Sequence, residues 1–497
     1  MKNPFEGKSV WFITGSQHLY GEETLKEVAK DAQKIAKGLS SSAQVPVQVI
    51  ARGVVTTSQE ILKVVREANQ DDSCVGIALW MHTFSPAKMW IAGLQEMAKP
   101  FVHFHTQFYR EIPWDSIDMD YMNLHQSAHG GREFGHIVSR MRINRHVIAG
   151  HWQEDDVQKE FGDWARVAVG CTEAKSMKVA RFGDNMRTVA VTDGDKVSAQ
   201  QKFGMVVDGY GIMDLVDVMN SVGEDAVDRV IAEYEGLYEI EEACRKGNEK
   251  HATLREEARV EIALRTFLDA GGYTAFTTTF EDLHGMKQLP GLAVQRLMAD
   301  GYGFGGEGDW KTAAMTHIMK VIGYGTGKGT SFMEDYTYHF TSDGGKVLGA
   351  HMLEVCPSIA RGKVKISVQP LGIGGKNDPA RMIFTAQEGE ALNASLIDIG
   401  DRFRLVVNEV VSVTPDADLP RLPVASVLWE PKPNLSVGAA AWIYTGAAHH
   451  SVYSQAISSL QLEMLASMWD IEMILIDGST SLRSLQSELR WNDVSFR

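Results

Sequence analysis

The first candidate for chemistry is Glu307, which stands in a run rich in glycine, Gly303-Phe304-Gly305-Gly306-Glu307-Gly308-Asp309-Trp310. Glycine lets a backbone approach a ligand closely and adopt angles that other residues avoid. A strand that ends at this turn would project the Glu307 carboxylate into a cleft, with Phe304 and Trp310 able to shield it. An isolated acidic residue in a turn is usually a solvated surface residue, so this run leaves both interpretations open.

A second carboxylate, Glu334, lies in the run Ser331-Phe-Met-Glu-Asp-Tyr-Thr-Tyr-His-Phe340, among aromatic side chains. A carboxylate in apolar surroundings must be paired with a charge or must bind a cation. Perturbed carboxylates occur in structural ion pairs as well as in active sites. The run therefore supports a structural ion pair and a cation site equally.

Two histidines complete a set of candidate metal ligands. His351 lies in a strand-like run (348–357), and His450 follows His449 in Gly446-Ala-Ala-His-His, which we expect to be a turn. A lone strand histidine is usually a core residue, whereas adjacent histidines among small residues are harder to explain that way. Two glutamates and two histidines suit Mn²⁺, with Co²⁺ or Mg²⁺ as substitutes, better than Zn²⁺. Ligands spread from 307 to 450 cannot be established by spacing alone.

Two further glycine-rich runs resemble phosphate-binding motifs, but their contexts are wrong. The run 301–306 matches GxGxxG, yet a helix is predicted before it, where the dinucleotide-binding motif requires a strand. The run 327–330 resembles part of a P-loop, but Ile322 and Gly329 occupy positions that this motif reserves for glycine and for serine or threonine. We interpret the stretch 323–329 as a flexible linker.

The elements that must position these residues alternate between strands and helices in the first 110 residues. Strands are predicted at 9–14, 45–50, 75–81 and 101–104, and helices at 22–39, 61–68 and 86–97, with Thr57 capping the second helix. Such alternation predicts a parallel sheet, in which ligands bind beyond the carboxyl ends of the strands. The polar turns 15–18 and 82–85 lie at those ends.

A second α/β block begins near residue 177, and the pattern becomes β-rich after about residue 325. We predict strands at 178–182 and 275–280 and helices at 226–238, 256–268, 290–298 and 310–321. Beyond them, strands are predicted at 346–355, 364–369, 380–385, 394–399 and 402–411, closed by a helix at 459–469. The predicted fold is two parallel-sheet α/β domains of flavodoxin-like or Rossmann-like type (1–176 and 177–325), followed by a β-rich domain (326–497).

The composition excludes several classes of partner. The chain has 497 residues and a net charge of -15, which disfavours nucleic acids and anionic membranes. Its four cysteines form no CxxC pair, as expected in a reducing compartment. We recognise no signal peptide and no run of 18 apolar residues. We therefore expect a cytoplasmic protein.

The chain resembles the L-arabinose isomerase family along almost its whole length. The motifs that carry the resemblance include GSQHLYG (15–21), WMHTFSPAKMW (80–90), AHGGREFG (128–135), GYGFGGEGDWK (301–311), GTSFMEDYTYHF (329–340) and GAAHHSVYS (446–454). The resemblance implies conversion of L-arabinose to L-ribulose, the first step of arabinose catabolism, through a metal-bound enediol(ate), and a second activity from D-galactose to D-tagatose.

The resemblance also assigns roles to residues. It implies that Glu307, Glu334, His351 and His450 hold Mn²⁺ and that the two glutamates transfer protons. It implies a sugar pocket lined by Gln17, Leu19, Tyr20, Phe84, His129, Met186, Phe280 and Ile373. It further implies a homo-oligomer, typically a hexamer, with sites at subunit interfaces, where we expect His129 to reach a neighbouring subunit's site.

Three alternatives stay open. A metal-mediated hydride shift would give the same products as an enediol route. A metal-free glycoside hydrolase could use Glu307 and Glu334 as its paired carboxylates. A non-catalytic sugar-binding protein could also be built from tandem α/β domains, although the lack of a recognisable leader and the surplus of potential metal ligands argue against it.

Overall fold

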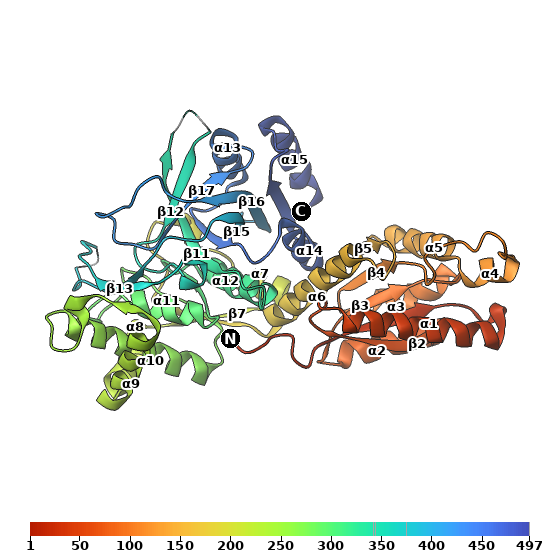
Figure 1. Ribbon diagram of the computed structural model, residues 1–497, viewed down its shortest axis with the longest axis horizontal. Helices are drawn as coiled ribbons and strands as arrows, with labels where there is room; N and C mark the ends of the chain where they lie inside the picture. Colours follow the sequence, from red (N-terminus) through yellow and green to blue (C-terminus); the bar gives the residue numbers. More distant parts are fainter. Residues whose placement is uncertain (341, 343, 374, 497) are drawn as a thin grey trace. The chain divides into compact units, whose positions relative to one another are not determined.

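The computed structural model describes residues 1–497 except 341, 343, 374 and 497 (Figure 1). The chain divides into two compact units, residues 2–172 and residues 173–497 together with Met1. Each unit has its own sheets and core, and we describe each by itself. No helix among the described residues is both long and apolar enough to cross a membrane.

The N-terminal unit is built on one parallel sheet of five strands in the order β2-β1-β3-β4-β5. The strands are β1 (Ser9–Gly15), β2 (Gln48–Val55), β3 (Cys74–Trp80), β4 (Phe101–His105) and β5 (His146–Ala149). This is the order of a flavodoxin-like sheet, in which the chain reverses direction between β1 and β3. The expected parallel α/β fold is confirmed, and a ligand site is expected where β1 and β3 end.

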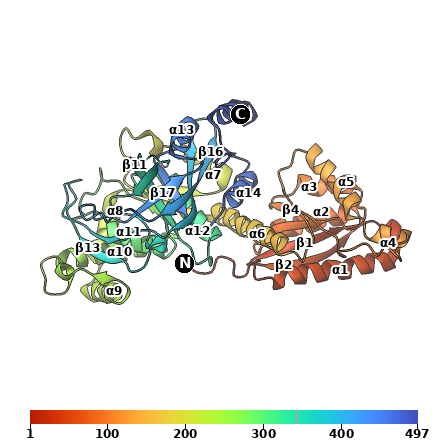
Figure 2. The same cartoon turned by 45° about the horizontal axis from the view of Figure 1, so that its top comes forward.

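Helices cover both faces of this sheet, as the side chains of β1 illustrate. Trp11 and Ile13 are buried against α2 (Ser58–Gln70), α3 (Ile91–Gln95) and α5 (Ser127–Arg140). Phe12 points to the opposite face, where its ring contacts Phe104 of β4. Phe104 in turn contacts Phe161 of α6 (Asp155–Ser176). Helix α1 (Gly21–Ser41) runs beside β2 (Figure 2). Thr57 caps α2 as predicted, in a capping box with Glu60.

The second unit begins with a smaller parallel sheet in the order β10-β9-β6-β7. Its strands are β6 (Lys178–Phe182), β7 (Val206–Tyr210), β9 (Ala275–Thr277) and β10 (Gly303–Gly305), and its helices are α7 (Lys196–Phe203), α8 (Ile212–Ser221), α9 (Glu224–Leu237), α10 (His251–Gly271), α11 (Gly291–Ala299) and α12 (Trp310–Ile322). Glu307 lies in the turn between the short β10 and the helix α12, so these elements position the first candidate ligand.

The β-rich part contains a sheet in the order β15-β18-β11-β12-β17-β16-β19, and β15 also pairs with β16. That extra pairing closes six strands into an antiparallel ring, with β19 added in parallel to β16. The strands are β11 (Thr330–His339), β12 (Lys346–Ala350), β15 (Gly389–Asp398), β16 (Phe403–Val413), β17 (Ser426–Pro431), β18 (His450–Ser454) and β19 (Glu472–Ile476). A small sheet joins β14 (Ala380–Ile383), β13 (Lys365–Val368) and β8 (Glu239–Ile240).

Helix α12 lies at the centre of this unit. It contacts β9 and β10 of the parallel sheet and also β11, β15 and β18 of the ring, and every one of its residues is buried.

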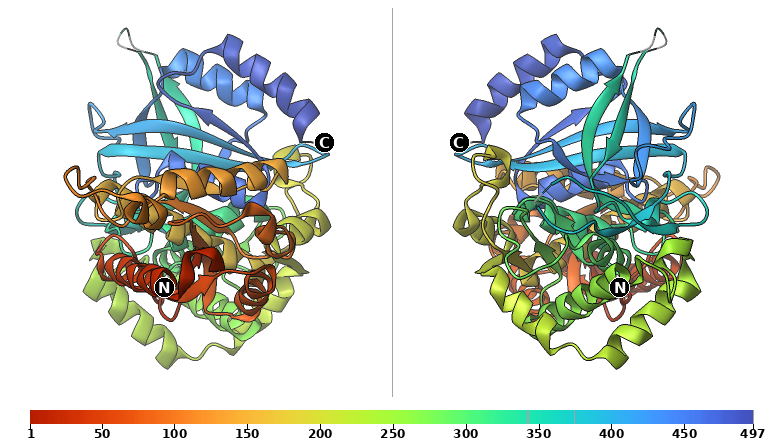
Figure 3. Two further views of the ribbon diagram at one scale, coloured as in Figure 1. Left: turned by 90° about the vertical axis from the view of Figure 1, so that its right-hand side faces the viewer. Right: turned by 90° about the vertical axis from the view of Figure 1, so that its left-hand side faces the viewer.

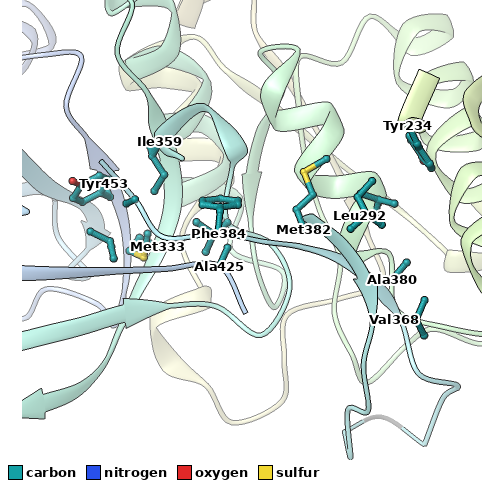
Figure 4. Close-up of a cluster of buried hydrophobic side chains, with 14 of the residues drawn as sticks. Tyr234, Leu292, Met333, Ile359, Val368, Ala380, Met382, Phe384, Ala425 and Tyr453 are labelled. Carbon is teal, nitrogen blue, oxygen red and sulfur yellow. The ribbon is translucent and has the colours of Figure 1, made fainter. Parts of the chain in front are cut away.

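The helices α13 (Leu435–Thr445) and α15 (Leu482–Ser495) lie together outside the ring, as the blue helices of Figure 3 show, and α14 (Ser459–Trp469) packs on β16 and β19. A continuous apolar core connects α9 and α11 to the strands (Figure 4).

Candidate metal centre

The four predicted ligands meet in the second unit, on one face of three neighbouring strands. Glu334 on β11 is the direct cross-strand partner of His450 on β18 and of Ala350 on β12. His351 follows Ala350, and Glu307 approaches from the turn between β10 and α12. The prediction that His450 lies in a turn was wrong, because it is the first residue of β18, and the predicted strand 346–355 ends at Ala350.

The backbone at Glu307 takes a conformation that fixes its carboxylate. Glu307 has a φ of 62°, which is uncommon for a residue with a side chain. Its carbonyl accepts a hydrogen bond from the Met186 amide at 2.9 Å, and the Gly308 amide donates to the Thr278 carbonyl at 3.1 Å. Gly308 has a φ of 85°, and a Cβ there would lie 2.7 Å from the Asn185 Cα. The turn therefore needs glycine after Glu307, as the glycine-rich run suggested.

The side-chain donors of the four residues converge on one point. The Nε2 atom of His450 lies 3.7 Å from Oε2 of Glu307 and 3.6 Å from Oε1 of Glu334, and Nε2 of His351 lies 3.8 Å from Oε2 of Glu334. Glu307, Glu334 and His351 each offer a ligand atom within 4.8 Å of the others, and so do Glu307, His449 and His450. One small cation could therefore be reached by all of them.

The two buried imidazoles are oriented as metal ligands usually are. Nε2 of His351 and Nε2 of His450 are both buried without a hydrogen-bond partner, although such atoms are normally satisfied. The other ring nitrogen of each is held by a carboxylate: Nδ1 of His450 lies 3.1 Å from Asp309 Oδ2, and Nδ1 of His351 bonds to Glu354. A carboxylate behind the ring fixes the tautomer that presents Nε2 to a metal. The residues present thus fit a divalent cation.

The electrostatics of the cluster favour positive charge. Burial alone would lower the pKa of His351, but the carboxylates of Glu354, Glu334 and Glu307 outweigh burial and raise it to about 9. For Glu307, burial acts to raise the pKa, and the histidines His449, His450 and His351 reverse this and hold it below its usual value. The negative charge of Glu307, Glu334 and Glu354 therefore favours a positive charge at this place, which a proton or a metal ion can supply.

An apolar side chain forms the floor of the cluster. Phe332 lies two residues before Glu334 on β11 and is fully buried. Its ring lies edge-on to His351 at 4.9 Å and to His450 at 5.2 Å between centroids. This ring excludes water from beneath the two imidazoles, which strengthens electrostatic interactions above it.

Sequence reasoning missed three residues that belong to the cluster. Asp309 and Glu354 orient the histidines, and their signal was present as acidic residues two and three positions from a candidate ligand. His449 is half exposed, and its Nε2 lies 3.5 Å from Oε1 of Glu334 and 3.9 Å from Oε2 of Glu307. The pairing of His449 with His450 was noted in the sequence, but only the structure places both rings beside the same carboxylates.

Two of the expected pocket residues of this unit touch the metal cluster. The Met186 amide is bonded to the Glu307 carbonyl, and the ring of Phe280 stacks on His351 with centroids 6.4 Å apart. Ile373, which lies in a loop, is 39% exposed. Met186 and Phe280 therefore lie next to the metal cluster, and their place in a sugar pocket stays a prediction.

The other five expected pocket residues lie in the N-terminal unit, near the ends of β1 and β3. Gln126 links two of them, donating from Nε2 to the Tyr20 hydroxyl at 3.0 Å and placing Oε1 2.8 Å from Nδ1 of His129. Phe84 stacks on His129 with centroids 4.8 Å apart. Gln17 immediately precedes the turn of 3-10 helix His18–Tyr20, in which Leu19 is 83% exposed. These residues form a cluster of their own, in a different unit from the metal ligands.

The sequence matches the domains of one known protein family along almost its whole length. Three family models match in succession: the L-arabinose isomerase N-terminal domain over residues 4–176, its central domain over 178–325 and its C-terminal domain over 329–472. The L-arabinose isomerase of Geobacillus stearothermophilus is 56% identical over 487 residues, covering 98% of each chain. That of Serratia proteamaculans is 55% identical over 496 residues, covering 100% of this chain and 99% of the relative.

A solved periplasmic sugar-binding protein of an ABC transporter from Legionella pneumophila aligns with 63% of this chain and 94% of its own. Its sequence identity is 10% and its TM-score is 0.13, so the alignment says nothing about a shared fold.

Proposed function

The chain belongs to the L-arabinose isomerase family, and from this premise we propose that it converts L-arabinose to L-ribulose at a divalent-metal centre held by Glu307, Glu334, His351 and His450. Membership makes it an aldose–ketose isomerase. The observation that carries the metal centre is the pair of buried, unpartnered Nε2 atoms of His351 and His450, which face two carboxylates.

We propose Mn²⁺ as the cation, with Co²⁺ or Mg²⁺ as substitutes, because two carboxylates and two imidazoles form a mixed donor set with room for further oxygen ligands. Such a cation polarises a sugar carbonyl and balances negative charge that develops on its oxygens. His449 lies beside both carboxylates at the exposed side of the cluster, where it can contact a sugar hydroxyl.

The protein's own contribution is proton transfer by its two carboxylates. One of Glu307 and Glu334 removes the proton from C2 of the sugar and returns it to C1, while the other moves the hydroxyl proton, so that the sugar passes through an enediolate. The fixed backbone at Glu307 supports this role, because a proton acceptor must be held at a constant distance from C2. If the reaction runs in D₂O, product should carry deuterium at C1. Full retention of the substrate hydrogen would favour a hydride shift instead.

D-Galactose is proposed as a second substrate, giving D-tagatose. It shares the configuration of L-arabinose at C2, C3 and C4 and differs by one hydroxymethyl group at the far end. That group lies away from the reacting carbons, so it affects fit in the pocket rather than proton transfer.

We further propose a cytoplasmic hexamer in which the N-terminal cluster of one subunit completes the metal site of another. Exposed apolar side chains of the N-terminal unit support this, among them Leu19 at 83% and Trp114 at 80% exposure. A contiguous exposed apolar patch marks an interaction surface, and we propose that these residues belong to one.

The deciding experiment is an assay of L-ribulose formation from L-arabinose by the purified protein, before and after chelation. Activity should vanish with chelator and return best with Mn²⁺. Full activity of the chelated protein would overturn the metal centre, and sugar-bond hydrolysis without isomerisation would favour a glycoside hydrolase.

A further inference from the structure

Helix α12 carries two buried lysines, Lys311 and Lys320, that the proposed reaction does not use. Lys311 is 1% exposed and Lys320 is 9% exposed. A buried ammonium group is costly unless its charge and its hydrogen atoms are all matched. Lys320 donates to the Thr330 carbonyl at 2.6 Å and lies 3.3 Å from the Cys356 sulfur, at the end of α12 away from Glu307. Lys311 lies at the other end, and its partners lead to the metal centre.

The Lys311 ammonium group has three acceptors, one for each of its N–H bonds. It lies 3.2 Å from Oδ1 of Asp309, and it donates to the carbonyls of Val191 at 3.0 Å and Asp193 at 2.5 Å. An ammonium has three donors and no acceptor, so these contacts saturate it. Lys311 thus joins the carboxylate behind His450 to a distant part of the chain.

That part is the segment 184–195, which follows β6 and reaches the metal centre at several points. The Met186 amide bonds to the Glu307 carbonyl at 2.9 Å. At its other end a Cβ on Gly194 would lie 2.9 Å from the Trp310 ring, so the backbone rests directly on the start of α12. The segment therefore spans from the backbone of one metal ligand to the residue beside Asp309.

We propose that Lys311 is a positioning residue that ties the segment 184–195 to the Asp309–His450 pair, so that the imidazole ligand and the Met186 contact are held by one side chain. This inference rests on the proposed metal centre. Asp309 faces Nδ1 of His450 with Oδ2 and the Lys311 ammonium with Oδ1. It also caps α12, accepting from the Lys311 and Thr312 amides and from the Thr312 hydroxyl. The Lys311 cation adds a charged contact to these capping bonds, and we expect its loss to let the Asp309 side chain turn away from Nδ1, so that His450 loses its fixed tautomer.

The same side chain fixes the segment, because two of its carbonyls have Lys311 as a buried donor. Removing the ammonium leaves the Val191 and Asp193 carbonyls without that partner. The segment should then separate more often from α12, and the Met186–Glu307 bond should open with it. One substitution should thus weaken metal binding and loosen the sugar pocket together.

The test compares Lys311→Met with Lys320→Met, which removes the other buried ammonium of the same helix without touching Asp309 or the segment. Calorimetric titration of metal-stripped protein with Mn²⁺ gives the affinity, and hydrogen–deuterium exchange gives the opening of residues 184–195. Lys311→Met should raise the Kd for Mn²⁺ by roughly tenfold and speed exchange in the segment by about fivefold or more. Lys320→Met should lower the melting temperature but leave Kd and segment exchange as in the wild type.

Asp309→Asn separates a positioning role from general damage. If Lys311 acts through Asp309, adding Lys311→Met to Asp309→Asn should weaken Mn²⁺ binding by less than twofold further, although each single change weakens it. Equal loss of affinity in Lys311→Met and Lys320→Met, or additive losses in the double variant, would overturn the proposal.

The two readouts also separate this inference from the proposed function. Failure of the wild type to bind Mn²⁺ would overturn the metal centre, whereas the exchange of residues 184–195 reports the tether with or without metal. Unchanged exchange in Lys311→Met would overturn the tether even if Mn²⁺ binding and isomerisation were both established.

Discussion

Glu334 and His450 are direct cross-strand partners on the antiparallel strands β11 and β18, although 115 residues lie between them along the chain. Directly opposed side chains on one face of a sheet lie close together. Because a shift of one residue would turn one of them to the other face, the register of these two strands decides whether the metal cluster exists.

The first prediction concerns the two carboxylates. Glu307→Gln and Glu334→Gln keep the shape of each side chain but remove the proton acceptor and a charged metal ligand. Each variant should lose at least about a hundredfold in turnover, as expected for loss of general acid–base catalysis. L-Ribulose formation measures this, and circular dichroism checks that the variants are folded. Near-normal turnover in either variant would show that its carboxylate is a structural residue.

The second prediction concerns the carboxylates behind the histidines. Glu354→Gln should weaken Mn²⁺ binding by about 10–100-fold, because it loosens the ring that presents Nε2 to the metal. Calorimetric titration measures the change. Glu257→Gln is the matched control, since Glu257 is equally buried but bonds to the Ala293 amide and the Gln288 side chain. The interpretation fails if both variants bind Mn²⁺ with the same affinity.

The third prediction tests the turn after Glu307. Gly308→Ala places a Cβ 2.7 Å from the Asn185 Cα at a φ of 85°, and it should cost about 1–3 kcal/mol or more and displace Glu307. Gly325→Ala is the control, because Gly325 has a similar φ of 79° but an added Cβ would meet nothing within 4 Å. It therefore introduces backbone strain without a steric clash. Thermal unfolding and turnover of both variants should show a larger loss for Gly308→Ala. Equal losses would mean that the contact with Asn185 does not matter.

The fourth prediction is an acid sensitivity of the N-terminal unit. Burial lowers the pKa of His82 to about 3, of His103 to about 4 and of His125 to about 4, and neighbouring His125 and His105 act in the same direction on the first two. Below the ordinary histidine pKa of about 6.5 the unfolded chain binds more protons than the folded one, so the free energy of unfolding falls as pH falls from about 6.5 towards 4.

Denaturant unfolding of the metal-free protein at about pH 7.5, 6.5 and 5.5 measures this fall in the free energy of unfolding. His103→Leu removes one of the titrating groups, whose Nε2 has no hydrogen-bond partner, and should make stability less dependent on pH. A stability that is constant over this range would contradict the prediction.

The fifth prediction tests whether sites are shared between subunits. His129→Ala should reduce turnover, because it removes a ring that can contact a sugar hydroxyl. If His129 serves a neighbouring subunit, mixed oligomers of His129→Ala and Glu307→Gln should regain activity, since some sites then combine both intact residues. Absence of any recovery on mixing would place each complete site within one subunit.

The fold was largely predictable because strand and helix periodicities are local signals. The strands around β1 and β3 and the helices α12 and α14 were predicted within a few residues. Helix α13 was not, because its apolar residues follow no clear helical stripe, and neither was the start of β18 at His450. In α13 the exposed residues Ile443 and Tyr444 are as apolar as the buried ones, which hides the helical periodicity.

The four proposed metal ligands could be predicted as residue types, but the residues that orient them could not. Asp309 and Glu354 lie close in sequence to Glu307 and His351, yet nothing local tells which ring nitrogen a carboxylate will face. The role of Lys311 could not be predicted for the same reason, because its partners are the backbone carbonyls of Val191 and Asp193, more than 100 residues away. Contacts that depend on tertiary packing leave no trace in the spacing of residue types.

The place of β18 in the ring has a consequence for biosynthesis. This strand lies between β15 and β11, and it carries His450, the last of the four proposed ligands. During translation the N-terminal parts of a chain emerge and fold first, so Glu307, Glu334 and His351 are made well before His450. A nascent chain that stops short of β18 lacks both the fourth ligand and the strand that joins β15 to β11. If these four residues hold the metal ion as proposed, tight capture of the ion requires a chain that has been made through β18.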